Sequence, residues 1–243
     1  MSMDSPRHFR EVDPPLPPEK EIFRYLGYRG HRPEAHVREA VERCVGELLK
    51  AAEPKCVWRE FPLEWEEGDP CWGGLRVPSR NLAGNLKDCH SLILFAATLG
   101  IGPDRLIARA SVAKISDMAI YQAASAAMIE EVCHELNRNL AEEAAGRGDF
   151  LRPRFSPGYG DFSLAFQKDV LRLLDASRGA GISLTDSCLM LPSKSVTAVI
   201  GVSRINTGCL PEGCEACQKK DCGYRRNSSE GEEAAETAAR TKR

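Results

Sequence analysis

The sequence has no apolar segment long enough to cross a membrane. The run from Leu92 to Ile101 has only about half the length of a membrane-spanning helix. Neither sign of charge is in excess, because 33 lysines and arginines face 35 aspartates and glutamates, for a net charge of −2. Such a chain lacks the basic surface that nonspecific nucleic-acid binding requires. We therefore expect neither a membrane nor a nucleic acid as a partner.

The N-terminal residues contain no basic stretch followed by an apolar one, which is the pattern of a secretory signal. We therefore expect a cytoplasmic protein. Its ten cysteines still need an explanation. In the cytoplasm a disulfide framework is not expected, so buried thiols and a metal site are the better interpretation.

Composition divides the 243 residues into four segments. Residues 1–20 contain five prolines and few apolar side chains, and we expect a flexible arm there. Residues 21–205 carry the helix and strand patterns of a single mixed domain. Residues 206–226 are rich in cysteine and are interpreted as a metal-binding segment, and residues 227–243 have a composition typical of disorder.

Periodicity and capping signals predict five helices. Ser79 is expected to cap the second, Pro103 to lie in the first turn of the third, and Ser116-Asp117 to cap the fourth. The five ranges are 33–53, 79–86, 102–115, 116–146 and 163–177. Strands are expected at 56–65, 91–99, 182–191 and 194–203. Because helices and strands do not alternate regularly, the fold class is α+β, with helices packed on an antiparallel, twisted sheet.

The segment from Arg152 to Asp161 contains two prolines and two glycines, so it fits neither a helix nor a central strand. Pro157-Gly158 predicts a tight turn. A fixed loop with free N–H groups and a guanidinium suits a ligand that carries a carboxylate or a phosphate. From spacing alone, an ordinary connecting turn is equally consistent.

Two motifs in this region resemble the activation domain of cobalamin-dependent methionine synthase. Arg154-x-x-Pro157-Gly158-Tyr159 is similar to one family signature. The segment from Gly181 to Val196 is similar to the second, in which a Leu-Thr-Glu-Ser turn leads to Met-x-Pro and Ser-Val. The two blocks also have the order and separation of the family. The resemblance implies the same α+β fold.

In that family the domain binds S-adenosylmethionine and presents its methyl group to cobalt. The resemblance implies that Arg154 pairs with the ligand carboxylate and that Tyr159 hydrogen-bonds or lies over the sulfonium. It also implies ligand contacts from a helix glutamate and from backbone groups of the loop. Glu131 fits the glutamate better than Glu130, although both can be solvated residues on an exposed face. The expected ligand residues are Arg154, Phe155, Ser156, Gly158, Tyr159 and Glu131.

The resemblance has gaps. The family's Asp-Trp-Thr-Pro segment, whose aspartate contacts the ligand, has no counterpart here. The residues from Gly160 to Ser163 replace a Pro-Ala-Cys-Pro segment, and a cysteine-rich segment follows where the family has a tyrosine-bearing hairpin. The chain also has no room for homocysteine, folate and cobalamin modules. The resemblance therefore implies a free-standing subunit that serves a cobalamin-binding methionine synthase or another corrinoid protein.

The implied reaction requires no catalytic side chain from this protein. Inactive cob(II)alamin on the partner becomes methylcobalamin when it gains one electron, from a separate donor, and one methyl group. The role of the subunit is to position the sulfonium methyl group against cobalt. We expect His36, His90 and His134 to be surface or core residues.

A separate motif near the C-terminal end of the sequence indicates different chemistry. Four cysteines, Cys209, Cys214, Cys217 and Cys222, have a spacing that suits tetrahedral thiolate ligation of zinc or an iron–sulfur cluster. Spacing alone does not separate the two, and a reduced, metal-free segment is the alternative. The competing functions are therefore a cysteine-ligated redox or electron-transfer protein and a noncatalytic interaction module.

Overall fold

The computed structural model describes residues 6–28 and 32–206, and the expected metal ligands Cys209 to Cys222 lie outside this range. The described residues belong to one compact unit, Met1–Thr207. Its elements are β1 (His8–Glu11), α1 (Glu19–Tyr25), α2 (Ala35–Ala51), β2 (Lys55–Pro62), β3 (Glu64–Glu66), β4 (Asp69–Trp72), β5 (Leu75–Arg76), α3 (Arg80–Asn85), β6 (Cys89–Thr98), α4 (Gly102–Ala113), α5 (Ile115–Gly146), β7 (Phe150–Leu151), the 3-10 turn η1 (Leu164–Phe166), α6 (Gln167–Leu174), α7 (Ala176–Ala180), β8 (Ser183–Leu184), β9 (Met190–Leu191) and β10 (Ser195–Ser203).

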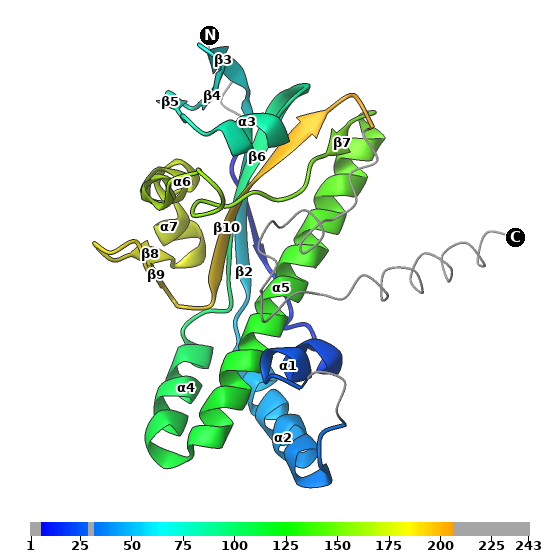
Figure 1. The fold of residues 1–243 in the computed structure, drawn as a ribbon, viewed down its shortest axis with the longest axis vertical. Helices are drawn as coiled ribbons and strands as arrows, with labels where there is room; N and C mark the ends of the chain where they lie inside the picture. Colours follow the sequence, from blue (N-terminus) through cyan, green and yellow to red (C-terminus); the bar gives the residue numbers. More distant parts are fainter. Residues whose placement is uncertain (1–5, 29–31, 207–243) are drawn as a thin grey trace, which may run out of the picture. The chain divides into compact units, whose positions relative to one another are not determined.

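A five-stranded antiparallel sheet in the order β1-β2-β6-β10-β7 forms the centre of this unit (Figure 1). The central strand β6 is the apolar run expected at 91–99. Its side chains alternate between two cores, with Ile93 and Phe95 in one and Leu92 and Leu94 in the other. A strand that is buried on both faces needs no polar alternation, which explains the continuous apolar sequence. The α+β class and the antiparallel sheet are as predicted.

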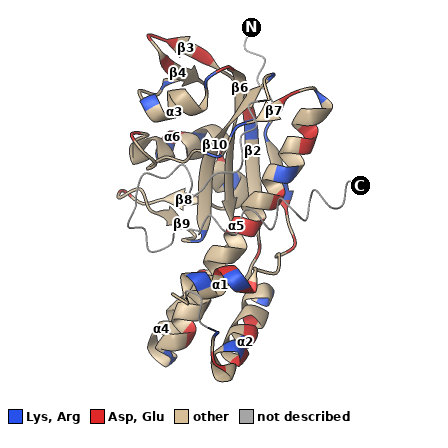
Figure 2. Cartoon of the chain, turned by 45° about the vertical axis from the view of Figure 1, so that its right-hand side comes forward, with Lys and Arg blue, Asp and Glu red and all other residues tan. Residues whose placement is uncertain are grey.

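Helix α5 has 32 residues and covers one face of the sheet. Helices α1, α2 and α4 pack against it (Figure 1). Figure 2 shows charged residues of both signs spread along these helices. The prediction that Ser116 and Asp117 cap this helix is wrong, because α5 begins at Ile115. The Asp117 carboxylate instead accepts a hydrogen bond of 2.6 Å from Arg43 and so joins α5 to α2.

The other face of the sheet is covered by α6 and α7, and the single helix predicted at 163–177 is wrong. Asp175 has a left-handed backbone (φ 49°) and separates α6 from α7. The strand predicted at 182–191 is also wrong over most of its length. Only β8 and β9 pair there, because the hydroxyl of Thr185 accepts from the Leu189 N–H at 3.0 Å and closes a polar turn between them.

The expectation of a flexible arm at residues 1–20 is wrong from His8 onward. Strand β1 pairs with β2, and the His8 ring stacks on Trp58 with centroids 5.3 Å apart. Helix α1 follows and buries Ile22 and Phe23. All four residues of β1 are exposed, so an edge strand held by backbone hydrogen bonds leaves no apolar period in the sequence.

The helices of residues 6–28 and 32–206 include no candidate for a membrane span, in length and apolar character together.

Gly102 marks a close contact between helices, because a Cβ there would lie 1.8 Å from the carbonyl oxygen of Ala51. We predict that Gly102→Ala lowers the free energy of unfolding by about 1–3 kcal/mol, since backbone must move to admit the methyl group. Gly46, inside α2, has open space around it. Gly46→Ala should raise the same quantity by about 0.5–1 kcal/mol through helix propensity. Urea unfolding of both variants measures the difference, and shifts of the same sign would contradict this packing.

Candidate functional site

The loop that follows β7 is held against the edge of β10. The Arg152 N–H donates to the Gly201 carbonyl oxygen at 2.8 Å. Phe155 and Val199 then exchange both backbone hydrogen bonds, at 2.9 and 2.8 Å. Pro157 cannot extend this pairing because it has no N–H. The residues between Arg152 and Pro157 are therefore fixed to the sheet, and the chain turns away directly after them.

The predicted Pro-Gly turn is present. The Tyr159 N–H donates to the Ser156 carbonyl oxygen at 3.1 Å, and Gly158 has φ of 93°. This is the geometry of a type II turn, in which glycine tolerates the positive φ at the third position. The Gly158 N–H donates to Phe162 at 2.7 Å. The backbone N–H of Phe155 is thus already used by β10 and that of Gly158 by the loop itself, whereas within residues 6–28 and 32–206 the Ser156 N–H has no hydrogen-bond acceptor.

Arg154 points from this loop toward α5. Its guanidinium donates to Glu130 Oε2 at 3.1 Å, and 22% of its side chain is exposed. An arginine in this loop could also pair with the nearby Asp149 or Asp161, but within the described residues Arg154 bonds to neither. Asp149 lies 3.0 Å from His90 Nε2, and Asp161 binds the beginning of α3. Arg154 is therefore a half-buried cation that pairs, among the described residues, with the Glu130 carboxylate, and solvent reaches part of its side chain.

The structure brings Glu130, and not Glu131, to Arg154. Glu131 lies 3.2 Å from His134 Nδ1 on a different side of α5. Neighbouring positions on a helix differ in direction by about 100°, so a shift of one residue decides which glutamate faces the loop. A ligand contact from Glu131 stays a prediction, and the geometry favours Glu130.

Tyr159 lies at the outer end of the turn and is 60% exposed. Its ring meets Phe155 edge-on, with centroids 6.2 Å apart, and Phe155 stacks on the buried Phe162. Desolvation by the protein around the phenol, followed by the charge of Glu130, raises the pKa of Tyr159. The phenol therefore stays neutral at physiological pH. It offers an aromatic face and a hydroxyl beside the Arg154–Glu130 pair.

Asp161 fixes the far side of the loop. Its carboxylate accepts hydrogen bonds from the Ser79 hydroxyl, from the Arg80 N–H at 2.8 Å and from the Asn81 N–H at 3.1 Å. The hydrogen bond from Ser79, above all, lowers the pKa of Asp161. Sequence spacing gave no signal for this contact, which joins residues about 80 positions apart.

The second family-like segment packs beside the beginning of α4. The Ser193 N–H donates to Asp104 at 2.7 Å, and the Lys194 ammonium donates to the Gln122 side chain at 2.6 Å. Burial lowers the pKa of Lys194. These contacts attach the start of β10 to α4 and α5, so the segment supports the strand that carries the loop.

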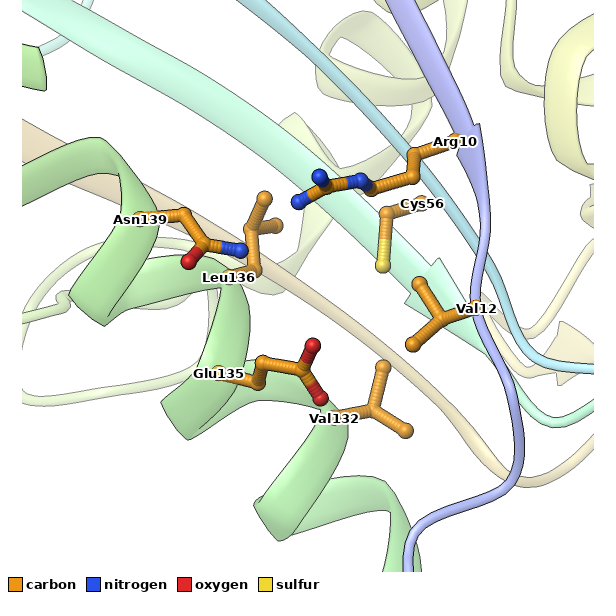
Figure 3. Close-up of a pocket in the computed structure, with 7 residues that line it drawn as sticks. All are labelled: Arg10, Val12, Cys56, Val132, Glu135, Leu136 and Asn139. Atoms are coloured by element: carbon orange, nitrogen blue, oxygen red, sulfur yellow. The ribbon is translucent and has the colours of Figure 1, made fainter.

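Two hollows elsewhere do not include the predicted ligand residues. The smaller lies between β1, β2 and α5, has room for about one water molecule, and is lined by Arg10, Cys56 and Glu135, among others (Figure 3). Burial, with the charge of Glu135, raises the pKa of Cys56 to about 12, so this thiol is protonated. The larger, of about 280 Å³, is lined by residues of α6, α7 and β8. The predicted residues of the loop, from Arg154 to Tyr159, lie instead on an open surface around Gly158 and Tyr159.

The cysteines of the described residues are free thiols. Buried thiols were expected, and Cys44, Cys56, Cys89 and Cys133 are buried. Among residues 6–28 and 32–206, no group of histidine, cysteine or acidic side chains is arranged to hold a metal ion. The four cysteines of the predicted metal site fall outside that range.

Comparison with solved structures finds a similar fold. No family model and no curated protein matches the chain. A solved structure, the crystal structure of the MetH reactivation domain bound to AdoHcy, matches with a TM-score of 0.62 over 82% of this chain and 79% of that one, at 15% sequence identity. The chain therefore has the fold of that domain, and the expected resemblance holds at the level of the fold.

Proposed function

We propose that this protein is an S-adenosylmethionine-binding activation subunit, which supports reductive methylation of cob(II)alamin on a partner methionine synthase or related corrinoid protein. The observation that carries the proposal is the Arg154–Glu130 pair beside Tyr159, held at a rigid turn on an open surface. The similar fold of a domain that binds AdoHcy supports it.

The charges of the site complement the amino-acid end of the ligand. S-adenosylmethionine carries a carboxylate, an ammonium group and a sulfonium. Arg154 can take the carboxylate through its fork of donors, and Glu130 can face the positive groups. The exposed face of Tyr159 suits a sulfonium. A charge-assisted hydrogen bond of this kind contributes about 1.5–3 kcal/mol.

The open position of the site suits transfer to another protein. When bound, S-adenosylmethionine supplies an electrophilic methyl group. The chain holds the amino-acid end, while a partner-bound corrinoid reaches the methyl group from the solvent side. Positioning of this kind needs no nucleophile or base from the subunit. The electron comes from a separate donor, and an iron–sulfur cluster in the cysteine-rich segment of this chain would suit its delivery to cobalt.

Arg154→Ala should weaken S-adenosylmethionine binding roughly 10- to 100-fold, because the ligand carboxylate loses its charged partner. Isothermal titration calorimetry on the full chain measures the dissociation constant. Arg138→Ala, which removes an exposed arginine of the same helix as Glu130, is the control and should bind like wild type. If the wild type gives no heat of binding, or if both variants bind equally well, the proposed site is wrong.

Glu130→Gln should weaken S-adenosylmethionine binding about 10-fold, because the site and the ligand then both carry net positive charge. The matched control is Glu131→Gln, which neutralises the adjacent residue without touching the Arg154 pair. We expect it to change the dissociation constant by less than about 2-fold, as for a surface substitution. A larger effect at Glu131 would restore the sequence-based assignment and contradict the one drawn from the structure.

We also propose that the four cysteines of the cysteine-rich segment bind zinc or an iron–sulfur cluster. These are Cys209, Cys214, Cys217 and Cys222. Metal analysis of the anaerobically purified full chain should find about one zinc, or the iron of one cluster with visible absorbance, per chain. Cys214→Ser with Cys217→Ser should abolish this content. Cys188→Ser, at a half-exposed free thiol of the β8–β9 turn, should leave it unchanged. A metal-free wild type would leave the segment as a reduced tail and remove the electron-transfer alternative.

A further inference from the structure

We infer that Asp161 is a positioning residue, which holds the ligand loop in its binding shape by fixing it to α3. This inference rests on the proposed function of the loop. The two sides of the turn are held by different hydrogen bonds. Before Pro157, the loop is bonded to β10 through Arg152 and Phe155. After Pro157, no strand supports the loop within the described residues, and Asp161 is its next strong attachment.

The Asp161 carboxylate makes three hydrogen bonds to one short stretch of chain. It accepts from the Ser79 hydroxyl and from the backbone N–H groups of Arg80 and Asn81. Ser79 is 2% exposed and also caps α3 by accepting from the Leu82 N–H at 3.1 Å. The loop thus binds to a helix start that is itself held in the core.

A second contact fixes the other side of the loop to the same helix. The side-chain amide of Asn85, the last residue of α3, donates to the Pro153 carbonyl oxygen at 3.3 Å. Helix α3 therefore contacts the loop just before Arg154 and again just after Tyr159. Arg154 and Tyr159, the two loop residues whose side chains are proposed to hold the ligand, lie between these two points.

Gly160 lies directly against the side chain of Asn81, in α3. The glycine has φ of 54°, and a Cβ there would lie 2.1 Å from Asn81 Nδ2. The turn is thus seated directly on α3, next to the residue whose N–H binds Asp161. Within the loop, the Phe162 N–H donates to the Tyr159 carbonyl oxygen at 2.9 Å. A displacement of Asp161 would therefore move the backbone that carries the Tyr159 ring.

Three measurements on the full chain distinguish a positioning role from a purely structural one. They are ligand affinity, hydrogen–deuterium exchange of the loop amides, and thermal stability. In Asp161→Ala we expect S-adenosylmethionine affinity to fall at least about 10-fold, with a melting temperature only a few degrees below that of wild type. Asp161→Asn keeps one acceptor oxygen and should give an intermediate affinity. Ser163→Ala removes another loop hydroxyl, which accepts from the Ala165 N–H at 3.3 Å, and should bind like wild type.

Hydrogen–deuterium exchange without ligand tests the same point independently of binding. The amides of Gly158 and Phe162 should exchange at least about 10-fold faster in Asp161→Ala than in wild type, because their hydrogen bonds open more often. Unchanged affinity in Asp161→Ala, or unchanged exchange of these amides, would overturn the inference. If the wild type does not bind S-adenosylmethionine, the proposed function fails, and exchange alone then decides whether Asp161 holds the loop. If Asp161→Ala does not fold, Asp161→Asn carries both measurements.

Discussion

The backbone pairing of Phe155 with Val199 is the contact on which the site depends. It ties the loop to β10, the strand next to the doubly buried β6, and so places Arg154 against α5. Arg154 and Glu130 are far apart in sequence, and they meet because the sheet packs on α5. Pro157 ends the pairing, and the type II turn directs Tyr159 outward beside them. The rigid edge of the sheet and the open turn together give a site that is both fixed and accessible.

Sequence reasoning succeeded where the local pattern and the burial agree. The predicted helix at 33–53 corresponds to α2, and the apolar run at 91–99 corresponds to β6. The turn at Pro157-Gly158 followed from proline and glycine chemistry alone. In each of these cases a few adjacent residues determine the conformation, so no knowledge of distant contacts was needed.

The corrections at β1 and at Asp117 share a physical cause, which is dependence on residues far away in sequence. β1 leaves no apolar signal because its partner strand, and not its side chains, holds it in place. Asp117 resembles a helix cap, but Arg43 of another helix takes its carboxylate. The choice between Glu130 and Glu131 depends on how α5 is rotated about its axis, which a helix with apolar and small residues on several sides does not reveal.

A crystal structure of the full chain with S-adenosylhomocysteine tests the central claim most directly. This compound keeps the carboxylate, the ammonium group and the adenosine of the proposed ligand and lacks only the transferable methyl group. Our account predicts its carboxylate at roughly 3 Å from the Arg154 guanidinium, with Tyr159 next to the sulfur. A ligand bound elsewhere, for example in the hollow lined by α6 and α7, with Arg154 still paired only to Glu130, would contradict it.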